Sequence, residues 1–496
     1  MEPMKRRVAS MLLVLAMLLV NTGCGGTETE TDTNESDNST NTTGGDGADD
    51  SSDETRIPYD FPELDCQQGD FNILNCDFVW DMYTYLDFEE MTGEVLDDAI
   101  YERNRSVEDM FNVNLVVEDL HIDELNTRIQ QTVLAGDDIY DVAYSRGDKI
   151  NSIIAGGYVT NLYDVPGLNL DQPWWNQSVI SEATIGDGDA VYFALNDFSL
   201  CAFDLVWCIF FNEDMLTSLG GELPYDLVRE GKWTIDAMHE LIKLGTNLNG
   251  DASFTFDREG NSVYGLASYS RLVGSLMTGA GVRFTEKNSE GYPELIIEND
   301  LFYSTAEKLA SIFGTAGDYI EANNRENGQN YEMLFEQNRA LFLGGEIKSA
   351  SVFRDMEDSF GIVPSPKYDE SQESYYSWMN HDTPTMCIPA TNADLETTGI
   401  VLDALSYLSY TDILPIYYSI RVSQKSLRNE DSIEMLGIIR DTLYYDASLT
   451  YGWTLDLYTK LIGKISTGDT NLASDIAAAK SSVEKKIATT FELMND

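Results

Sequence analysis

Strand-like and helix-like patterns alternate at the start of the folded part of the chain. The run FNILNCDF at residues 71–78 is apolar enough for a buried strand, and residues 97–112 carry apolar side chains at helical spacing. NVNLVVEDL then alternates as a strand, residues 122–135 predict a helix that ends at Gly136, and DIYDVAYS predicts a third strand. This order predicts a parallel sheet with helices on its faces, where ligands bind beyond the carboxyl ends of the strands.

A second unit of the same kind begins near Leu205. LVWCIFFN predicts a strand, and EDMLTSLG predicts a short helix that stops at a glycine. KWTIDAMHELIKLG predicts a further helix, with Thr234 as its N-cap residue and Asp236 in its first turn. The folded part has roughly 440 residues, which is too many for a single hydrophobic core, so we expect two lobes.

The first 23 residues have the layout of a secretory signal peptide. Residues 5–7 are basic, residues 8–20 are apolar, and two small residues stand before Cys24. The apolar stretch is too short to hold the mature protein by crossing a bilayer. The two small residues and Cys24 resemble the lipobox of bacterial lipoproteins, although Asn21 stands where that motif usually has leucine. The resemblance implies cleavage before Cys24 and lipidation of its thiol; the alternative is an ordinary signal peptide cleaved near the same place.

The segment after the cysteine is almost entirely polar. Residues 25–55 contain one apolar side chain, Ala48, and no lysine or arginine. Such a composition cannot offset the entropy lost on ordering, so it predicts a disordered, self-repelling spacer. We expect residues 24–66 to form a lipid-anchored linker that holds the folded body on the extracellular side of the membrane.

The net charge restricts the partners of the protein. The chain has 85 acidic and 31 basic residues, which gives a formal net charge of −54 spread along its length. Nucleic acid requires a basic surface to meet its phosphates, so the charge argues against a nucleic-acid partner. It suits a protein that stays in solution beside an anionic cell surface.

The cysteines leave two possible disulfides open. Cys66 and Cys76 flank a short loop, whereas Cys201 and Cys208 can pair only if the chain turns between them. We favour small buried hydrophobic side chains for Cys201, Cys208 and Cys387. No cysteine or histidine spacing matches a zinc site.

Five segments, taken in order, resemble the extracellular solute-binding proteins of ABC importers, the family that includes maltose-type sugar receptors. They are DIYDVAYSRGDKINSIIAGGYVTNL, FALNDFSLCAFDLVWCIFFNEDMLTSLG, KWTIDAMHELIKLG, LFEQNRALFLGGEIKSA and FGIVPSPKYD. The resemblance extends over nearly all of residues 70–450 and rests on the order of the segments. Maltose-type members have an aromatic residue after a small-residue turn, whereas Glu346 and Ile347 follow Gly344 and Gly345 here. This difference argues against maltose itself as the ligand.

The resemblance implies a periplasmic-binding-protein fold of type II. In that fold two α/β lobes are joined by a hinge, the ligand lies in the cleft between them, and the closed form docks on a membrane permease. A monomer with no catalytic activity and no cofactor is implied as well. We expect crossings near residues 196 and 360 to form the hinge, with the first lobe over 67–196 and 360–410, the second over 197–359 and 411–496, and the C-terminal helices packed across both.

The ligand that the resemblance implies is a sugar or an oligosaccharide. Sugars offer hydroxyl groups and flat apolar faces, so a sugar cleft needs aromatic platforms and hydrogen-bonding side chains. We take candidates from loops after predicted strands, from the segments that carry the resemblance and from tryptophans in polar loops. The candidate ligand-binding residues are Trp80, Asp81, Tyr83, Arg146, Asp148, Trp174, Trp175, Asn196, Asp197, Ser270, Arg271, Gly345, Glu346, Trp378, Asn380 and Trp453.

Several of these candidates have a structural alternative. Trp174 and Trp175 are neighbours in the loop QPWWNQ, and neighbours in an extended chain point to opposite sides. Two alternatives therefore stay open: one of the tryptophans lines the cleft, or both pack against the surface of the lobe. For Arg146 and Asp148 the alternative is an internal ion pair, and for the later tryptophans it is core packing.

Other classes of function stay open at this point. A surface glycoside hydrolase would need two facing carboxylates, and no strand-end pattern singles out such a pair. A receptor for a peptide or another polar solute would use the same aromatic and acidic side chains. A purely adhesive protein is disfavoured because the pattern is not one of repeated β modules. Residues 247–265 have some calcium-ligand residue types but lack the loop spacing, so we expect no metal.

Overall fold

A computed structural model describes residues 57–77, 84–186, 188, 190–324, 328–422 and 430–492. The chain divides into two units, residues 1–58 and 59–496, and the fold below is that of the second unit. The signal peptide, Cys24 and the polar spacer up to residue 55 lie outside the described residues. Their assignment therefore stays a prediction.

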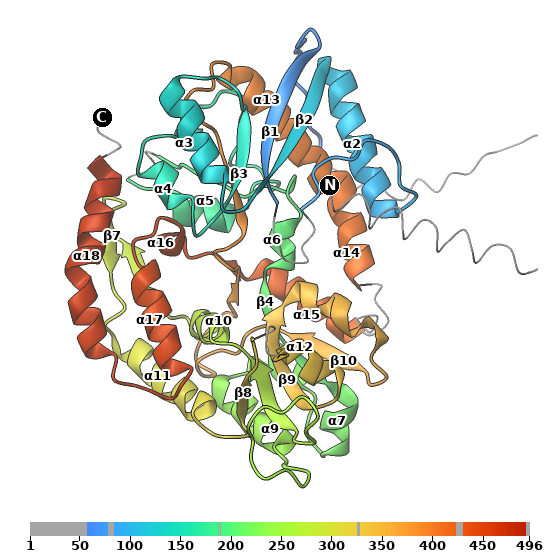
Figure 1. Ribbon diagram of the computed structural model, residues 1–496, viewed down its shortest axis with the longest axis vertical. Coiled ribbons are helices and arrows are strands. Elements are labelled where there is room, and N and C mark those ends of the chain that lie inside the picture. The colour runs from blue at the N-terminus through green and yellow to red at the C-terminus, as the bar shows by residue number, and fades with distance from the viewer. Residues whose placement is uncertain are drawn as a thin grey trace, which may run out of the picture. The chain divides into compact units, whose positions relative to one another are not determined.

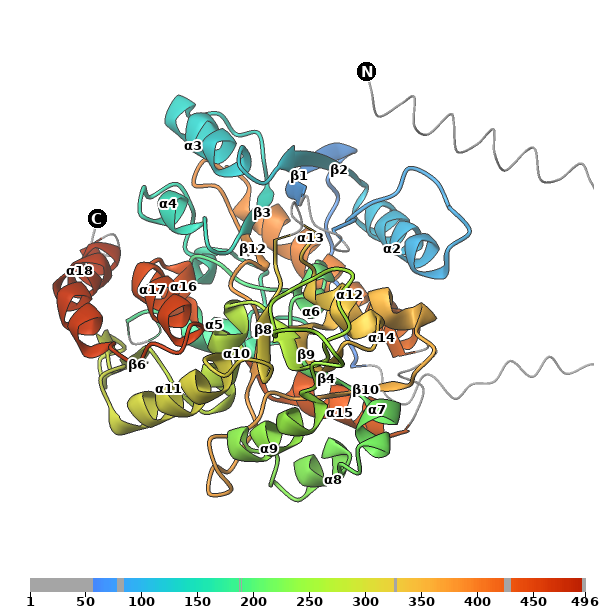
Figure 2. The ribbon, with the colours of Figure 1, turned by 60° about the horizontal axis from the view of Figure 1, so that its bottom comes forward.

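The first sheet contains the strands predicted at the start of the body. Its order is β12 (Pro384–Cys387), β3 (Val142–Arg146), β1 (Gly69–Asp77) and β2 (Val113–His121). Strand β1 runs parallel to β2 and β3, whereas β12 is antiparallel to β3. The predicted parallel sheet of β1, β2 and β3 is confirmed (Figure 1), and β12, labelled in Figure 2, extends it from far along the chain.

The helices of this region follow the apolar spacing, with small differences at their ends. Helix α2 covers Val95–Phe111, and α3 covers Leu125–Ala135 and ends at Gly136, which has a φ of 73°. The predicted start of α3 at residue 122 is three residues early because 122–124 form a turn. Strand β3 begins later than predicted because the carboxylate of Asp141 accepts the backbone N–H of Asn72 before the strand starts.

The second sheet has five strands in mixed orientation. Its order is β10 (Phe360–Val363), β4 (Trp207–Asn212), β9 (Ala340–Glu346), β5 (Tyr264–Ser268) and β8 (Tyr319–Glu321). The predicted strand β4 is buried over its whole length and antiparallel to both of its neighbours. Strand β10 pairs with β4, so the return crossing of the proposed lobes has to begin after Val363.

Helices cover this sheet where the pattern predicted them. Helix α7 covers Glu213–Ser218 and α9 covers Ile235–Gly245. The hydroxyl of Thr234 accepts the N–H of Ala237 at 3.2 Å, so the predicted N-cap of α9 is confirmed.

Two short pairs of strands and further helices complete the described elements. Strand β6 (Thr285–Lys287) is antiparallel to β7 (Pro293–Leu295), and β11 (Ser377–Trp378) is parallel to β13 (Leu443–Tyr444). The other helices are α4 Asn151–Ile154, η1 Leu162–Asp164, α5 Gln177–Ala183, α6 Cys201–Asp204, α8 Pro224–Arg229, α10 Arg271–Gly279, α11 Asp300–Phe313, α12 Tyr331–Glu336, η3 Ile347–Asp355, α13 Leu395–Leu408, η4 Ser409–Ile413, α14 Leu414–Val422, α15 Glu430–Asp441, α16 Ala447–Thr450, α17 Leu455–Ile465 and α18 Ala473–Glu492. Within the described ranges, every helix is too short or too polar to span a bilayer.

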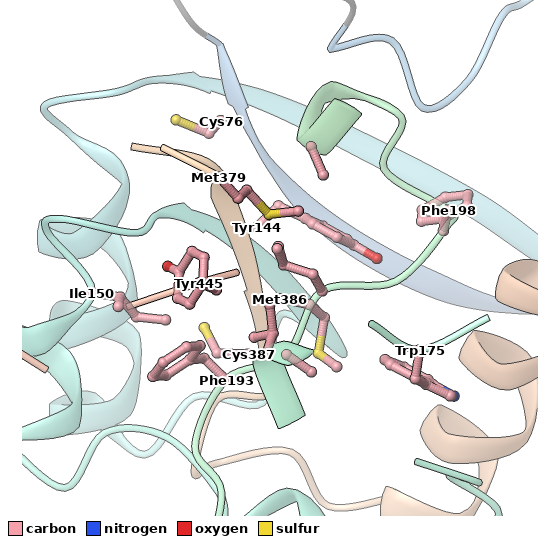
Figure 3. Packing of buried hydrophobic residues seen from close by; sticks show 14 of the residues in the cluster. Cys76, Tyr144, Ile150, Trp175, Phe193, Phe198, Met379, Met386, Cys387 and Tyr445 are labelled. Carbon is pink, nitrogen blue, oxygen red and sulfur yellow. The ribbon is translucent and has the colours of Figure 1, made fainter. Parts of the chain in front are cut away.

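Figure 3 shows the apolar packing beside the first sheet. Tyr144 of β3 and the β12 residues Met386 and Cys387 are buried together with Phe193 and Tyr445. The strand that returns from the second half of the chain is thereby built into the core of the first sheet, which fixes the position of the residues just before it.

The five described cysteines are free thiols, so neither disulfide considered from the sequence forms. Cys201, Cys208 and Cys387 are fully buried, as predicted for small apolar side chains.

Asp403 of α13 is a fully buried acceptor for four side chains. The indole N–H groups of Trp174 and Trp175 each donate to its Oδ1 atom at 2.8 Å. The hydroxyl of Tyr59 and the amide of Asn169 donate to Oδ2 at 2.6 and 2.7 Å. Both tryptophans therefore lie in the core, held to α13 by one carboxylate.

Replacing Asp403 by alanine should lower the free energy of unfolding by about 3 kcal/mol, because the two buried indole N–H groups lose their acceptor and Tyr59 and Asn169 lose a hydrogen bond. Urea unfolding followed by far-UV circular dichroism measures the change. The control is Glu396→Ala at an exposed position in the first turn of the same helix, which should cost less than about 1 kcal/mol. Equal stability of the two variants would contradict this account of the core.

Candidate functional site

An arginine at the end of β3 begins the candidate site. Arg146 is the last residue of the strand, and its Nε atom lies 2.6 Å from Oδ1 of Asp148. Its Nη2 atom lies 3.2 Å from Oδ2 of Asp382. The register explains the second contact, because Pro384 of β12 pairs with Arg146 and Asp382 stands two residues before it.

Gly147 separates these two charged residues because no side chain fits there. A Cβ atom at this position would lie 2.4 Å from the carbonyl oxygen of His381 and 2.9 Å from the hydroxyl of Tyr445. The end of β3 therefore packs directly against the segment that leads into β12.

A second arginine approaches Asp382 from the other sheet. Strand β5 ends at Ser268, and α10 begins at Arg271, which forms an ion pair with Oδ2 of Asp382. Arg271 also donates to Oδ1 of Asn380 at 3.1 Å. The carboxylate of Asp382 is thus shared by one arginine from each of the two large sheets.

A third strand end joins through Asn380. Its amide donates to Oε1 of Glu346 at 2.8 Å, and Glu346 is the last residue of β9. Lys348 lies 3.0 Å from Oε2 of the same glutamate. We call the set Arg146, Asp148, Arg271, Glu346, Asn380 and Asp382 the junction cluster.

Burial and the charges of the junction cluster shift the pKa values of Asp382, Asp148 and His381. Burial alone would raise the pKa of Asp382, but Arg271, His381 and Arg146 lower it below its ordinary value. Burial and the nearby charge of Asp382 raise the pKa of Asp148. Burial lowers the pKa of His381 to about 3. The charges of Arg271 and Arg146 lower it as well, whereas the charge of Asp382 acts to raise it. Asp382 is consequently the stable anion, and His381 is a neutral ring at physiological pH.

An aromatic wall with unused hydrogen-bonding groups stands beside the cluster. The ring centroids of Trp207 and Trp378 are 5.7 Å apart, and the His381 ring lies 5.7 Å from Trp378 and 5.5 Å from Tyr458. Among the described residues, the indole N–H of Trp207, Nδ1 of His381 and the hydroxyl of Tyr458 are buried without a hydrogen-bond partner. Buried polar groups are normally paired, so these atoms offer capacity for a polar guest or for water.

A cavity of about 400 Å³ has Tyr444 in its wall, the residue that pairs with Trp378 between β11 and β13. It is lined by Ser181 and Glu182 of α5, by the β6–β7 hairpin with Arg283, and by Tyr444, Ser448 and Trp453. Helices α16, α17 and α18 and the β6–β7 hairpin lie on the same side of the molecule (Figures 1 and 2). The volume lies within the range of small-molecule sites.

One short segment connects the cavity with the junction cluster. Tyr444 and Ser448 line the cavity, whereas Tyr445, between them in sequence, has its hydroxyl beside Gly147 at the end of β3. Asp446 in the same segment accepts the hydroxyl and the N–H of Ser448 at 2.6 and 3.0 Å. The segment 444–448 therefore contacts the cavity on one side and the end of β3 on the other.

Trp453 gives the cavity a flat aromatic surface. Its ring stacks on Tyr451 with centroids 4.6 Å apart and an interplanar angle of 7°. Its indole N–H donates to the hydroxyl of Thr490 on α18 at 2.9 Å. Both interactions hold the ring in one orientation, which suits stacking on a flat apolar face.

The structure brings several of the predicted residues together. Arg146, Asp148, Arg271, Glu346 and Asn380 meet in the junction cluster. The other candidates near it, at the same strand ends or on its aromatic and cavity walls, are Ser270, Gly345, Trp378 and Trp453.

Other predicted residues lie elsewhere. Trp174 and Trp175 contact Asp403 in the core, and the amide of Asn196 donates to Ser406 on α13 at 2.9 Å. The N–H of Asp197 donates to the carbonyl of Trp174 at 3.1 Å. Three further candidates, Trp80, Asp81 and Tyr83, lie outside the described residues.

Sequence reasoning did not single out Asp382, Lys348, Tyr458 or the charged residues of the cavity wall. Asp382 could have been found from the antiparallel pairing of β12 with β3, which places it opposite Arg146. The cavity residues have no local signal, because α5, the β6–β7 hairpin and the segment around 444–453 meet only in the folded chain.

Asp251, one of three acidic residues in the loop at 247–265, has a structural use. Oδ2 of Asp251 accepts the N–H groups of Asn261 and Ser262, each at 2.7 Å. These bonds close the loop. Across the ranges that the structure describes, no group of three or more His, Cys, Asp or Glu side chains is arranged to hold a metal ion.

Comparison with solved structures identifies the fold. No protein-family model matches the sequence, and no curated protein does. The chain is similar in structure to a cyclic α-maltosyl-1,6-maltose binding protein from Arthrobacter globiformis, with a TM-score of 0.54, 12% identity, and coverage of 84% of this chain and 98% of that one.

Two further similar structures come from other organisms. One is a maltose-binding periplasmic protein from Listeria monocytogenes in complex with maltose, with a TM-score of 0.52, 13% identity, and coverage of 85% and 98%. The other is an ABC transporter solute-binding protein from Thermotoga lettingae bound with α-D-tagatose, with a TM-score of 0.52, 12% identity, and coverage of 85% and 100%. The predicted fold class is confirmed: the chain has the two-lobed α/β fold of type II periplasmic binding proteins.

The half-buried carboxyl of Glu182 in the cavity wall makes the stability of the protein depend on pH. Burial, with a further contribution from the charge of Asp446, raises its pKa to about 7 from an ordinary value of 4.5. The folded protein therefore holds a proton between pH 4.5 and pH 7 that the unfolded chain has lost, so this group's contribution to stability falls as the pH rises from about 4.5 to about 7 and does not change further above it.

Glu182→Gln removes the cost of the buried charge. It should stabilise the protein at pH 8 by on the order of 2 kcal/mol, with a smaller gain at pH 5. Thermal unfolding at both pH values measures the difference. Glu286→Gln changes an exposed carboxylate on the same cavity and serves as the control, since its effect should not depend on pH. A gain for Glu182→Gln that is equal at pH 5 and pH 8 would refute the assignment.

Proposed function

We propose that the protein is a lipid-anchored extracellular substrate-binding protein of an ABC importer, which captures a sugar or an oligosaccharide and delivers it to a membrane permease. The observation that carries the proposal is the cavity of about 400 Å³ with Trp453 in its wall, next to a buried cluster of charged side chains from both sheets. The solved structures of similar fold described above are binding proteins, and their bound sugars support the ligand class.

The chemistry of the wall suits a carbohydrate. A sugar presents a flat face of C–H groups to an aromatic ring and hydroxyl groups to polar side chains. Trp453 offers the ring, and Ser448, Glu182 and Arg283 offer hydrogen-bonding groups around it. The same wall explains why a purely apolar ligand is disfavoured, since it would leave these polar groups buried without partners.

Capture requires that the ligand favour one arrangement of the two lobes. A guest that contacts both lobes at once stabilises the closed arrangement by its differential affinity. The cavity satisfies this requirement in the proposed division of the chain, because α5 belongs to the first lobe and the β6–β7 hairpin belongs to the second. The crossings after residue 196 and after Val363 are the proposed hinge.

Attachment to the membrane rests on the sequence alone. The proposal is that Cys24 carries the lipid and that the polar segment after it is the tether. Labelling of the protein with a fatty acid, and loss of that label in Cys24→Ser, tests this step. Labelling that survives the substitution would refute it.

Screening a glycan panel by thermal shift should find one sugar class that raises the melting temperature, because a ligand that binds only the folded state stabilises it. Trp453→Ala should then weaken binding of that sugar by at least about tenfold, which corresponds to about 1.4 kcal/mol. Titration followed by tryptophan fluorescence measures the affinity. Recovery of the sugar uncleaved separates a receptor from a glycoside hydrolase.

Matched phenylalanine variants guard against a mere loss of stability. Trp453→Phe keeps a ring in the cavity but loses the indole bond to Thr490. Trp233→Phe loses a comparable indole bond to the carbonyl of Pro364, in a core away from the cavity. Affinity should fall only for the Trp453 variants. Equal affinity in all three variants would contradict the proposed site.

A further inference from the structure

Two cations line the cavity, and neither forms an ion pair with a carboxylate among the described residues. Arg283 stands just before β6, and its guanidinium carbon lies 3.6 Å from the ring centroid of Tyr444 and 4.4 Å from that of Tyr376. Its Nη1 atom donates to the carbonyl oxygens of Val282 and Thr278 at 2.9 and 3.4 Å. Within the described residues, Nε and Nη2 have no hydrogen-bond partner, and no carboxylate lies within ion-pair distance.

Lys287 at the end of β6 has a similar position. Its ammonium donates to the carbonyl oxygen of Ser181 on α5 and forms no ion pair with any described residue. Thr285 and Lys287 are two residues apart in the strand, so their side chains lie on one face of the hairpin, and both line the cavity. The two cations therefore approach the cavity from the same hairpin.

Another arginine of the same lobe shows what a structural role looks like. The guanidinium of Arg339 is also without a carboxylate, but it donates through three nitrogens to the carbonyl oxygens of Ser262, Arg258 and Asp257. Every nitrogen of its guanidinium thus donates to the loop that it holds. Arg283, in contrast, is held in place by two tyrosine rings and one nitrogen, and half of its planar fork remains for a ligand.

No acidic side chain of the wall that the structure describes forms an ion pair with either cation. Glu182 lines the cavity outside ion-pair distance of both, and Glu286 is an exposed residue. Burial and Asp446 raise the pKa of Glu182 to about 7, although the charges of Lys287 and Arg283 act to lower it. The chain has a net charge of −54, so a cavity with two cations that form no ion pair with a described residue differs in charge from the rest of the protein.

We propose that the ligand of this cavity is an acidic oligosaccharide, one whose carboxylate or sulfate group is bound by Arg283 and Lys287 while Trp453 contacts a sugar ring. This rests on the proposed function and narrows it. A guanidinium fork forms paired, charge-assisted hydrogen bonds with either anion, and these bonds are stronger than those between neutral groups. The two cations also explain how a strongly negative protein can bind a negatively charged ligand.

Binding of matched glycans to the mature protein tests the inference. Tetragalacturonate is compared with its fully methyl-esterified form, and a chondroitin sulfate tetrasaccharide with its desulfated form, by calorimetric titration at fixed ionic strength. At least one acidic member should bind about tenfold or more tightly than its matched form, and the pair that shows the difference tells carboxylate from sulfate.

Substitutions then locate the anion. Arg283→Gln and Lys287→Gln should each weaken binding of the acidic glycan by about tenfold or more, whereas Arg283→Lys should retain part of the affinity. Arg229→Gln is the control, because it removes the same charge from a surface arginine of α8 outside the cavity. Lys287→Gln keeps the test valid if Arg283→Gln does not fold.

The binding results distinguish failure of the acidic-ligand proposal from failure of the proposed sugar-receptor function. Equal binding of acidic and neutral glycans, with no effect of Arg283→Gln or Lys287→Gln, overturns the acidic ligand and leaves a sugar receptor. A preference for acidic glycans that survives both substitutions also overturns the assignment to these two residues. Absence of binding by every glycan, neutral or acidic, overturns the proposed function together with the inference.

Discussion

The carboxylate of Asp382, held between Arg146 and Arg271, is the contact on which the rest of the site depends. One arginine ends a strand of the first sheet and the other begins a helix after a strand of the second. A buried carboxylate is costly unless it is paired, and removal of either arginine would leave a buried charge with half of its compensation. Because the anion needs both cations, the segment before β12 is fixed in position between the two arginines.

Several features follow from that constraint. Asn380 stands two residues before Asp382 and connects it to Glu346 at the end of β9, so three strand ends meet within a few residues of chain. His381 between them is buried and neutral beside Trp378 and Tyr458. The segment at 444–448 packs against this arrangement on one side and lines the cavity on the other. The ion pairs thus position the wall against which a ligand would rest, and the cavity provides the room.

Sequence patterns predicted most elements of the fold because those elements are set locally. Apolar spacing, N-caps such as Thr234 and stops such as Gly136 are properties of a few neighbouring residues. Arg146 and Asp148 were predicted for the site because a strand end in a parallel sheet is where ligands bind, and their position follows from β3 alone. Trp174 and Trp175 show the limit, since their partner Asp403 is 229 and 228 residues away and nothing in their loop indicates a buried carboxylate. The cavity was beyond local reasoning for the same reason, because its wall comes from three segments that meet only in the folded chain.

We expect a carbohydrate to bind in the cavity between α5 and the β6–β7 hairpin. A crystal structure of the protein grown with an oligosaccharide would show whether it does. The expected result is one sugar chain in that cavity, with a ring against Trp453 and polar contacts to residues of both proposed lobes. A sugar bound at another surface, with this cavity closed by the protein's own side chains, would contradict the proposed function.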